Sequence, residues 1–259
     1  MLTRIDTGAV AHLTMDAPAR LNALSDAMLA ALSAALSGIA PDSRIRAVIL
    51  SGAGKAFCAG HDLKEMQAGR QSPDKGAAYF ADLFTRCSAL MLQIQRQPQP
   101  VIAQVHGIAT AAGCQLVATC DLAVAATGTK FGVNGVNIGL FCSTPMVALT
   151  RNIGAKAAFE MLVTGKFIDT AEAIRLGLIN RAVTHENLAA ETMELAQTIA
   201  GKLGSAVKVG KRAFYEQAAL PVEAAYQHAG AVMADNMLNP DTDEGISAFL
   251  EKRPPGWVQ

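Results

Sequence analysis

The sequence predicts an α/β fold that continues into a helical C-terminal region. Half of the 259 residues are apolar and only 17% are charged, so the chain can bury a sizeable core. Short apolar runs typical of buried strands alternate with segments of helical periodicity. The order strand, loop, helix, strand occurs at least twice, which favours stacked ββα units. From residue 144 onward the pattern is mostly helical.

The N-terminal part predicts a strand at 8–15, a helix at 25–39 and a buried strand at 45–51. Ser25 is placed to cap that helix, because its hydroxyl can accept a backbone N–H of the first turn. A glycine-containing loop follows through residue 62. Residues 65–76 are polar and broken by glycine and proline, so we expect a mobile loop there.

The middle and end of the chain predict further elements: a helix at 77–96, strands at 101–105, 121–126 and 179–183, a Gly/Ala-rich turn at 106–113, a short helix near 113–119 and a last helix at about 242–252. Asp241 and Glu244 have capping-box spacing before the last helix. No Pro/Gly linker divides the chain. We therefore predict one domain, with a core over 1–195 and a helical region over 196–259.

Composition excludes several classes of protein. The 22 basic residues balance the 22 acidic ones, so a nucleic-acid partner is not expected. The five cysteines form no CxxC pair, which disfavours a metal cluster or a disulfide framework and favours a reducing cytoplasm. The first residues lack a signal-peptide pattern, and the apolar runs are too short to cross a membrane.

Common nucleotide and hydrolase motifs are missing. The stretch from Gly52 to Gly54 follows a strand, but the third glycine of GxGxxG falls on Phe57. There is no P-loop and no GxSxG nucleophile elbow.

Two stretches carry the functional argument: KAFCAGHDLKEM at 55–66 and VIAQVHGIATAAGCQL at 101–116. The first provides a tight loop after a strand, and the second opens a short helix. Together they can aim two backbone N–H groups at one oxygen, as an enolate requires, and the helix dipole adds to them. Small residues let the ligand approach the backbone closely.

In this order and spacing, the two stretches resemble the crotonase (enoyl-CoA hydratase/isomerase) superfamily. The resemblance continues through FGVNGVNIGL at 131–140 and EGISAFLEKRPP at 244–255, and is strongest for the enoyl-CoA hydratase domain-containing protein 3 group. It implies a spiral of ββα units with a C-terminal helical trimerisation region. It also implies a homotrimer or hexamer, and an acyl-CoA thioester as substrate, with coenzyme A entering as part of that substrate and no separate cofactor or metal.

By motif position, the resemblance assigns the oxyanion hole to the backbone N–H groups of His61 and Ala112. Many relatives have glycine where this chain has Ala111 and Ala112, so the space through which a ligand approaches these backbone groups should be narrower. The resemblance implies further contacts to coenzyme A from the backbone groups of Ala59, His61 and Leu63, from the cations Arg20 and Lys64, and from Phe249 and Lys252 of a neighbouring subunit.

The chain departs from the hydratases at both catalytic glutamates. The first position is Gln115 and the second is Gly135. A glutamine amide cannot accept or release a proton near neutral pH. We therefore expect a protein that binds and polarises an acyl-CoA without the two-glutamate hydration mechanism.

Three side chains have more than one interpretation. Gln115 could orient a water or a polar acyl substituent, or satisfy nearby backbone. His61 could act as a base, or be a solvated loop histidine. Cys142 lies near the expected acyl pocket, or is a buried small apolar residue.

The activity itself stays open. The GHD loop at 60–62 and VNIG at 136–139 are similar to methylmalonyl-CoA decarboxylases, although those relatives have a tyrosine near the position of Cys142. Decarboxylation generates the enolate without a base. The chain could instead be a non-catalytic acyl-CoA binder, or a residual enoyl-CoA hydratase or isomerase of fatty acid metabolism.

Overall fold

The core of the protein is a six-stranded sheet of order β1-β2-β3-β4-β6-β8, in which only β1 is antiparallel to its neighbour. The computed structural model describes residues 1–257. The strands of this sheet are β1 (Leu2–Thr7), β2 (Val10–Met15), β3 (Ala47–Gly52), β4 (Val101–Val105), β6 (Leu122–Ala126) and β8 (Arg181–Val183). A second, parallel pair is formed by β5 (Ile108–Thr110) and β7 (Lys130–Gly132).

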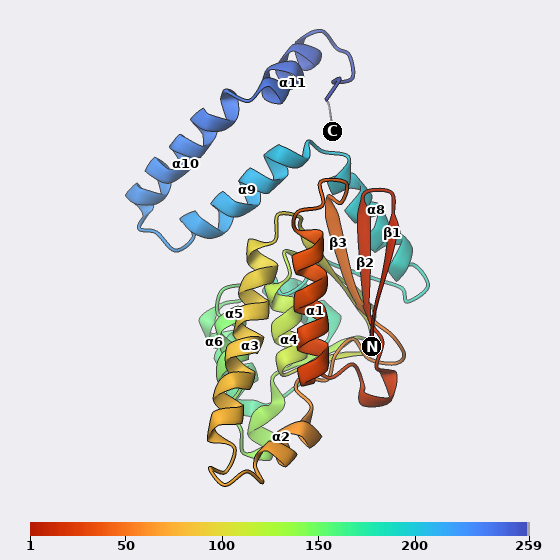
Figure 1. Cartoon of the computed structure of the whole chain (residues 1–259), viewed down its shortest axis with the longest axis vertical. Coiled ribbons are helices and arrows are strands. Elements are labelled where there is room, and N and C mark those ends of the chain that lie inside the picture. The colour runs from red at the N-terminus through yellow and green to blue at the C-terminus, as the bar shows by residue number, and fades with distance from the viewer. Residues whose placement is uncertain (258–259) are drawn as a thin grey trace.

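Helices cover both faces of the large sheet (Figure 1). On one side lie α1 (Asp26–Ile39), α3 (Ala77–Arg96) and α4 (Ala112–Thr119), and on the other lies α8 (Leu188–Ala200). This is the α/β architecture that the sequence predicts. The remaining elements of the body are η1 (Pro18–Arg20), α2 (Leu63–Gly69), η2 (Asn134–Ile138), α5 (Ser143–Leu149), α6 (Ala155–Thr164) and α7 (Thr170–Leu176).

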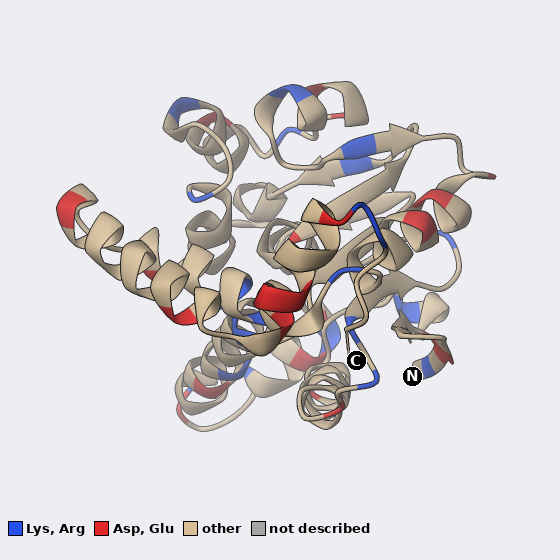
Figure 2. Ribbon diagram, turned by 90° about the horizontal axis from the view of Figure 1, so that it is seen from above, with Lys and Arg blue, Asp and Glu red and all other residues tan. Residues whose placement is uncertain are grey.

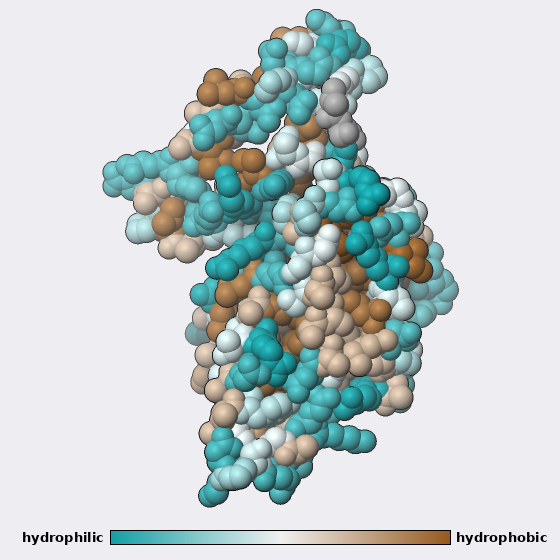
Figure 3. Space-filling model, viewed as in Figure 1, coloured by the Kyte–Doolittle hydropathy of each residue, from teal (hydrophilic) through white to brown (hydrophobic). Residues whose placement is uncertain are grey.

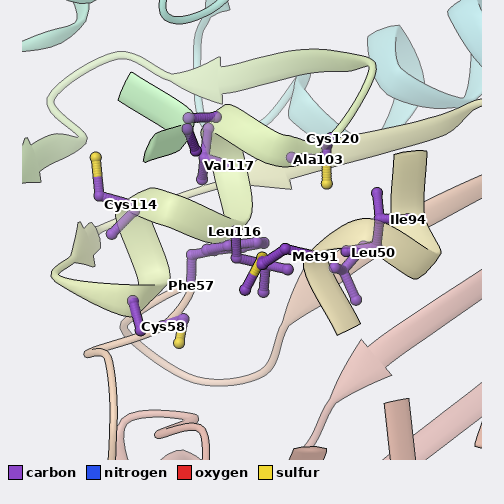
Figure 4. Close-up of a cluster of buried hydrophobic side chains, with 14 of the residues drawn as sticks. Leu50, Phe57, Cys58, Met91, Ile94, Ala103, Cys114, Leu116, Val117 and Cys120 are labelled. Atoms are coloured by element: carbon purple, nitrogen blue, oxygen red, sulfur yellow. The ribbon is translucent and has the colours of Figure 1, made fainter. Parts of the chain in front are cut away.

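Strand alternation sends side chains into two cores. In β3, Val48 and Leu50 belong to the larger cluster under α1, α3 and α4, while Ala47 and Ile49 belong to the cluster under α8. Figure 4 shows the larger cluster, where Leu116 of α4 lies close to Phe57 and Met91. This packing holds α4 against the loop that follows β3.

The segment at 65–76 differs from the predicted mobile loop, because it begins inside a helix. The Asp62 carboxylate accepts the backbone N–H groups of Lys64 and Glu65 at 2.9 and 3.2 Å. This N-cap satisfies two donors that a helix start leaves free, so α2 forms despite its polar sequence. At the start of α1, the predicted cap is present, with Ser25 Oγ accepting the Met28 N–H at 3.2 Å.

The last helix begins earlier than predicted, and the proposed Asp241–Glu244 capping box is wrong. The cap is Asn239, whose side-chain oxygen accepts the Asp241 N–H at 2.9 Å. Pro240 occupies the first helical position, where its missing N–H costs nothing. Glu244 instead pairs with Arg253 at 2.6 Å.

Three helices form an arm that projects from the body (Figure 1): α9 (Gly204–Gln217), α10 (Val222–Met237) and α11 (Pro240–Leu250). The predicted boundary at 195/196 falls inside α8, which packs on the sheet, so the arm begins only at Gly204. Apolar side chains on the arm are left exposed, and patches of them appear in Figure 3. Basic and acidic residues are interspersed over the molecule (Figure 2). Within residues 1–257, every helix is too short or too polar to span a bilayer.

Candidate active site

The two predicted loops lie against each other. Thr110 donates its N–H to the Cys58 carbonyl at 3.0 Å, which ties the segment before α4 to the loop after β3. A Cβ placed on Gly60 would be 3.0 Å from the Ala111 Cβ and 3.3 Å from the Ala112 nitrogen. The fold therefore brings the GHD loop and the N-terminus of α4 into direct contact.

Each of these segments contributes a free backbone donor. Across the described residues, neither His61 nor Ala112 donates its N–H to a protein acceptor. Ala112 is the first residue of α4, where the N–H lacks an intrahelical partner and the helix dipole is positive. The flanking groups are engaged, since Gly60 O accepts the Leu24 N–H at 2.8 Å. Two unpaired donors therefore remain on adjoining segments.

Backbone crowding explains the small residues here. Gly60 has a φ of +91°, and a side chain on Gly113 would overlap the Cys58 carbonyl. Ala111 has a φ of +50° with a ψ of −120°, a region that favours glycine. Ala111 therefore holds a strained conformation at the mouth of the site, and its methyl group lies over Gly60.

His61 is an internal histidine rather than a solvated one. Its Nδ1 lies 3.3 Å from the Leu24 carbonyl, which can only accept, so Nδ1 carries the proton in this contact. The ring packs edge-on against Phe84 at 5.7 Å between centroids. Nε2 is buried without a partner in the described structure, and burial lowers the pKa of the imidazole. The side chain is thus held neutral, with a lone pair on Nε2.

Gln115 lies one turn after Ala112 on α4, and it is only 4% exposed. Its Oε1 has no hydrogen-bond partner among the described residues, so the amide does not satisfy nearby backbone through that atom. It lines a cavity between α3, α4 and α5. A buried, neutral amide therefore occupies the position at which the resemblance expects the first glutamate.

The position expected for the second glutamate has no room for a side chain. A Cβ on Gly135 would overlap the Leu140 carbonyl and lie 2.8 Å from Cys142 Sγ. Cys142 is buried, and burial raises the pKa of its thiol. The segment from Leu140 to Cys142 thus fills the space that a carboxylate would need.

The cations expected to meet coenzyme A differ in their surroundings. Arg20 pairs with Asp62 at 2.6 Å and approaches Glu65 at 3.4 Å. The Arg20 guanidinium is therefore paired with carboxylates of this chain, and it holds Asp62 in place as the cap of α2. Lys64 is exposed and makes no ion pair within residues 1–257.

The backbone groups expected to contact coenzyme A lie at the surface of the same loop. Ala59 is half-buried and donates its N–H to the Leu21 carbonyl at 3.0 Å, while no described backbone N–H donates to the Ala59 carbonyl. Leu63 begins α2 and is exposed. Phe249, 81% exposed, and Lys252 lie at the end of the arm, away from this loop in the same chain (Figure 1).

Two supports of the site escape prediction from the sequence. One is the Asp62 cap, although the spacing of Asp62 and Glu65 is a recognisable helix-start signal. The other is the hydrogen bond from Thr110 Oγ1 to Asn134 Oδ1, 2.6 Å long, which joins β5 to the turn carrying Gly135. No local pattern predicts that contact, because the two residues are distant in sequence.

Comparisons with known proteins identify the family of the chain. The family model for enoyl-CoA hydratase/isomerase matches residues 6–259. The mitochondrial enoyl-CoA hydratase domain-containing protein 3 of Mus musculus is 44% identical over 248 residues, which cover 96% of this chain and 81% of the relative. Its Homo sapiens counterpart is 43% identical over 96% of this chain and 80% of its own length.

Solved structures show the same fold. An enoyl-CoA hydratase from Mycobacterium smegmatis superposes with a TM-score of 0.95 at 54% identity, covering 100% of this chain and 99% of its own. The human domain-containing protein 3 superposes with a TM-score of 0.94 at 41% identity, covering 99% of each chain. The chain therefore belongs to the enoyl-CoA hydratase/isomerase, or crotonase, family.

Proposed function

We propose that this protein is an enzyme that binds an acyl-CoA thioester and polarises its carbonyl between the backbone N–H groups of His61 and Ala112. The observation that carries the proposal is the pair of free donors on two segments in contact. Donors preorganised at such a position stabilise the negative oxygen of an enolate, and removing one costs about 10²–10³ in rate in well-studied enzymes.

Two-glutamate hydration is not the proposed reaction. Gln115 cannot transfer a proton, and Gly135 is packed against Leu140 and Cys142. Each general acid or base contributes about 10²–10⁴ in rate, so its loss should leave crotonyl-CoA hydration weak. Rapid hydration by the pure protein would falsify this part of the proposal.

His61 is the base that we propose for α-proton transfer. Burial lowers the pKa of its imidazole and so favours the neutral form, and Nε2 has no partner among the described groups. Asp62 and Glu65 lie close by, at the cap and in the first turn of α2, but both are engaged. Asp62 contacts the α2 N-terminus and Arg20, and Glu65 accepts the Asp26 N–H at 2.8 Å. These carboxylates are therefore less suited to the role.

A second candidate is decarboxylation of a carboxylated acyl-CoA. Loss of carbon dioxide would generate the enolate directly, so the two N–H donors suffice and no base is required. The neutral Gln115 favours this candidate, because an anionic substrate would not be repelled there.

We also propose that copies of the chain assemble through their arms, as homotrimers or paired trimers. The arm leaves Tyr226, Leu238 and Phe249 largely exposed, and such surface is normally covered. Phe249 and Lys252 of one copy would then close over the coenzyme A of another. Light scattering gives the oligomeric state.

The cytoplasmic location stays a prediction, since two of the compared relatives are named as mitochondrial proteins, and cell fractionation tests it.

The decisive experiment follows exchange of the α-protons of butyryl-CoA in heavy water by NMR. We expect deuterium to enter the α-position well above the buffer rate, and His61→Ala to abolish this exchange while butyryl-CoA still broadens on binding. Binding without exchange would reject His61 as a base and leave decarboxylation or a non-catalytic binder. Release of carbon dioxide from methylmalonyl-CoA then separates those two.

A further inference from the structure

A cavity of about 250 Å³ lies beside Gln115, between α3, α4 and α5. Its polar lining consists of Ser88, Gln95, Gln115, Thr119, Thr144 and Arg151. Met91, Val147 and Ala148 contribute apolar surface. A cavity of this size and mixed lining can hold a short chain of methylene groups with a polar end.

The polar side chains around this cavity are rich in unused donors. In the described structure, the side chains of Ser88, Gln95 and Thr144 make no hydrogen bonds. The Arg151 side chain is exposed at the edge of the cavity, donates once, to the Val147 carbonyl at 3.0 Å, and forms no ion pair with any described residue. Among residues 1–257, no aspartate or glutamate lines the cavity. The lining therefore carries one uncompensated positive charge and several free donors.

Gln115 points to a ligand independently of this charge. It is 4% exposed, and its Oε1 has no partner in the described protein. A buried polar group without a partner is costly and rare in native proteins. Its amide can turn to present N–H₂, so the group can donate to an acceptor inside the cavity.

The cavity lies in line with the proposed carbonyl site. Ala112, Gln115 and Thr119 are spaced at i, i+3 and i+7, so they share one face of α4. At a rise of about 1.5 Å per residue, Gln115 lies about 4.5 Å and Thr119 about 10 Å along the helix from Ala112. An acyl chain whose carbonyl rests at the N-terminus of α4 would reach the cavity with its far carbons.

We propose that the acyl group of the substrate ends in a carboxylate, which this cavity binds through Arg151, Gln115 and the neighbouring hydroxyls. This inference rests on the proposed acyl-CoA function and specifies its substrate class. A carboxylate accepts hydrogen bonds only, so it complements a lining made of donors and one cation. A glutamate at position 115 would repel it, whereas the amide does not.

A hydrocarbon end fits the same cavity less well. It would cover Met91 and Val147, but it would leave the buried Gln115 Oε1 without a partner and would offer no acceptor to the exposed Arg151 guanidinium. The wild-type chain should therefore prefer a carboxylated acyl group over an unsubstituted one of the same length.

The test compares hexanoyl-CoA with adipoyl-CoA, which have the same number of acyl carbons and differ in the terminal carboxylate. Isothermal titration should give a Kd for adipoyl-CoA at least about tenfold lower, equivalent to about 1.4 kcal/mol. Arg151→Met should remove this preference by weakening adipoyl-CoA alone. Gln115→Glu should do the same, because it adds a negative charge beside the carboxylate. Arg44→Met, at an exposed site paired with Asp42, is the matched control and should change neither Kd.

Each outcome has a distinct meaning. Equal affinities, tighter binding of hexanoyl-CoA, or a preference that survives Arg151→Met overturns the carboxylate proposal while leaving acyl-CoA binding in place. Failure of both thioesters to bind overturns the proposed function as well. A preference that disappears in both cavity variants and persists in the control supports the assignment.

Discussion

Replacing Gly135 tests whether a glutamate could be introduced at this position of the fold. The alanine Cβ would overlap the Leu140 carbonyl and press on Cys142 Sγ at 2.8 Å. Backbone cannot retract as a flexible side chain does, so the turn around residues 139–142 must move. Overpacking of this kind costs about 1–3 kcal/mol. For a chain of this size, about 1 kcal/mol lowers Tm by about 2–4 °C, so Gly135→Ala should lose about 2–12 °C.

Thermal unfolding followed by circular dichroism measures this loss at a fixed protein concentration, because assembly shifts Tm by mass action. Gly38→Ala is the matched control. Gly38 lies in α1 with open space around its Cβ position, so alanine there should gain about 0.5–1 kcal/mol. We therefore expect Tm to fall in Gly135→Ala and to rise in Gly38→Ala.

Crowding at Gly135 also limits activity. The variant Gln115→Glu/Gly135→Glu should not acquire rapid crotonyl-CoA hydration, because the second carboxylate cannot enter the site without displacing Leu140 and Cys142. A Gly135→Ala protein that melts within about 1 °C of the parent, or a double variant that hydrates crotonyl-CoA rapidly, would show that the turn yields easily and refute the steric argument.

Three further predictions concern the surroundings of the site. Ala111→Gly should raise the free energy of unfolding by about 0.5–1 kcal/mol in urea titration. The substitution relieves a positive φ that costs an L-residue about 1–2 kcal/mol, but glycine also makes the unfolded chain more flexible, which offsets part of the gain. A lower free energy of unfolding would contradict the strain at Ala111. Burial lowers the pKa of His61, so below the ordinary value near 6.5 the unfolded chain binds more protons than the folded one, and stability should fall as the pH drops. His61→Gln should therefore reduce the change in urea midpoint between about pH 7.5 and about pH 5.5. An equal change in midpoint for the parent and the variant would refute this prediction. Lys211→Met should lower the free energy of unfolding by about 3–5 kcal/mol, because it leaves the buried Asp121 carboxylate without the cation that it contacts at 2.6 Å. Tyr215→Phe removes only a hydroxyl hydrogen bond to the same carboxylate, so its loss in urea titration should be smaller.

Local sequence signals predicted much of the secondary structure. The helix over 77–96 and the strand over 101–105 have the predicted bounds, because their apolar periodicity is uninterrupted and their ends are marked by glycine or proline. The errors occur where a single side chain decides the outcome. Asp62 turns a polar stretch into a helix, and Asn239 starts the last helix before the predicted box.

The family, the fold class and the presence of Gln115 and Gly135 at the two expected glutamate positions all follow from residue identity, because they depend on which amino acids stand at motif positions. What those residues can do depends on three-dimensional packing. Packing pairs Arg20 with Asp62, buries the imidazole of His61, fills the space beside Gly135 and leaves Gln115 facing a cavity. These properties arise from contacts between segments tens of residues apart, and a linear pattern carries no information on which distant groups supply the neighbours.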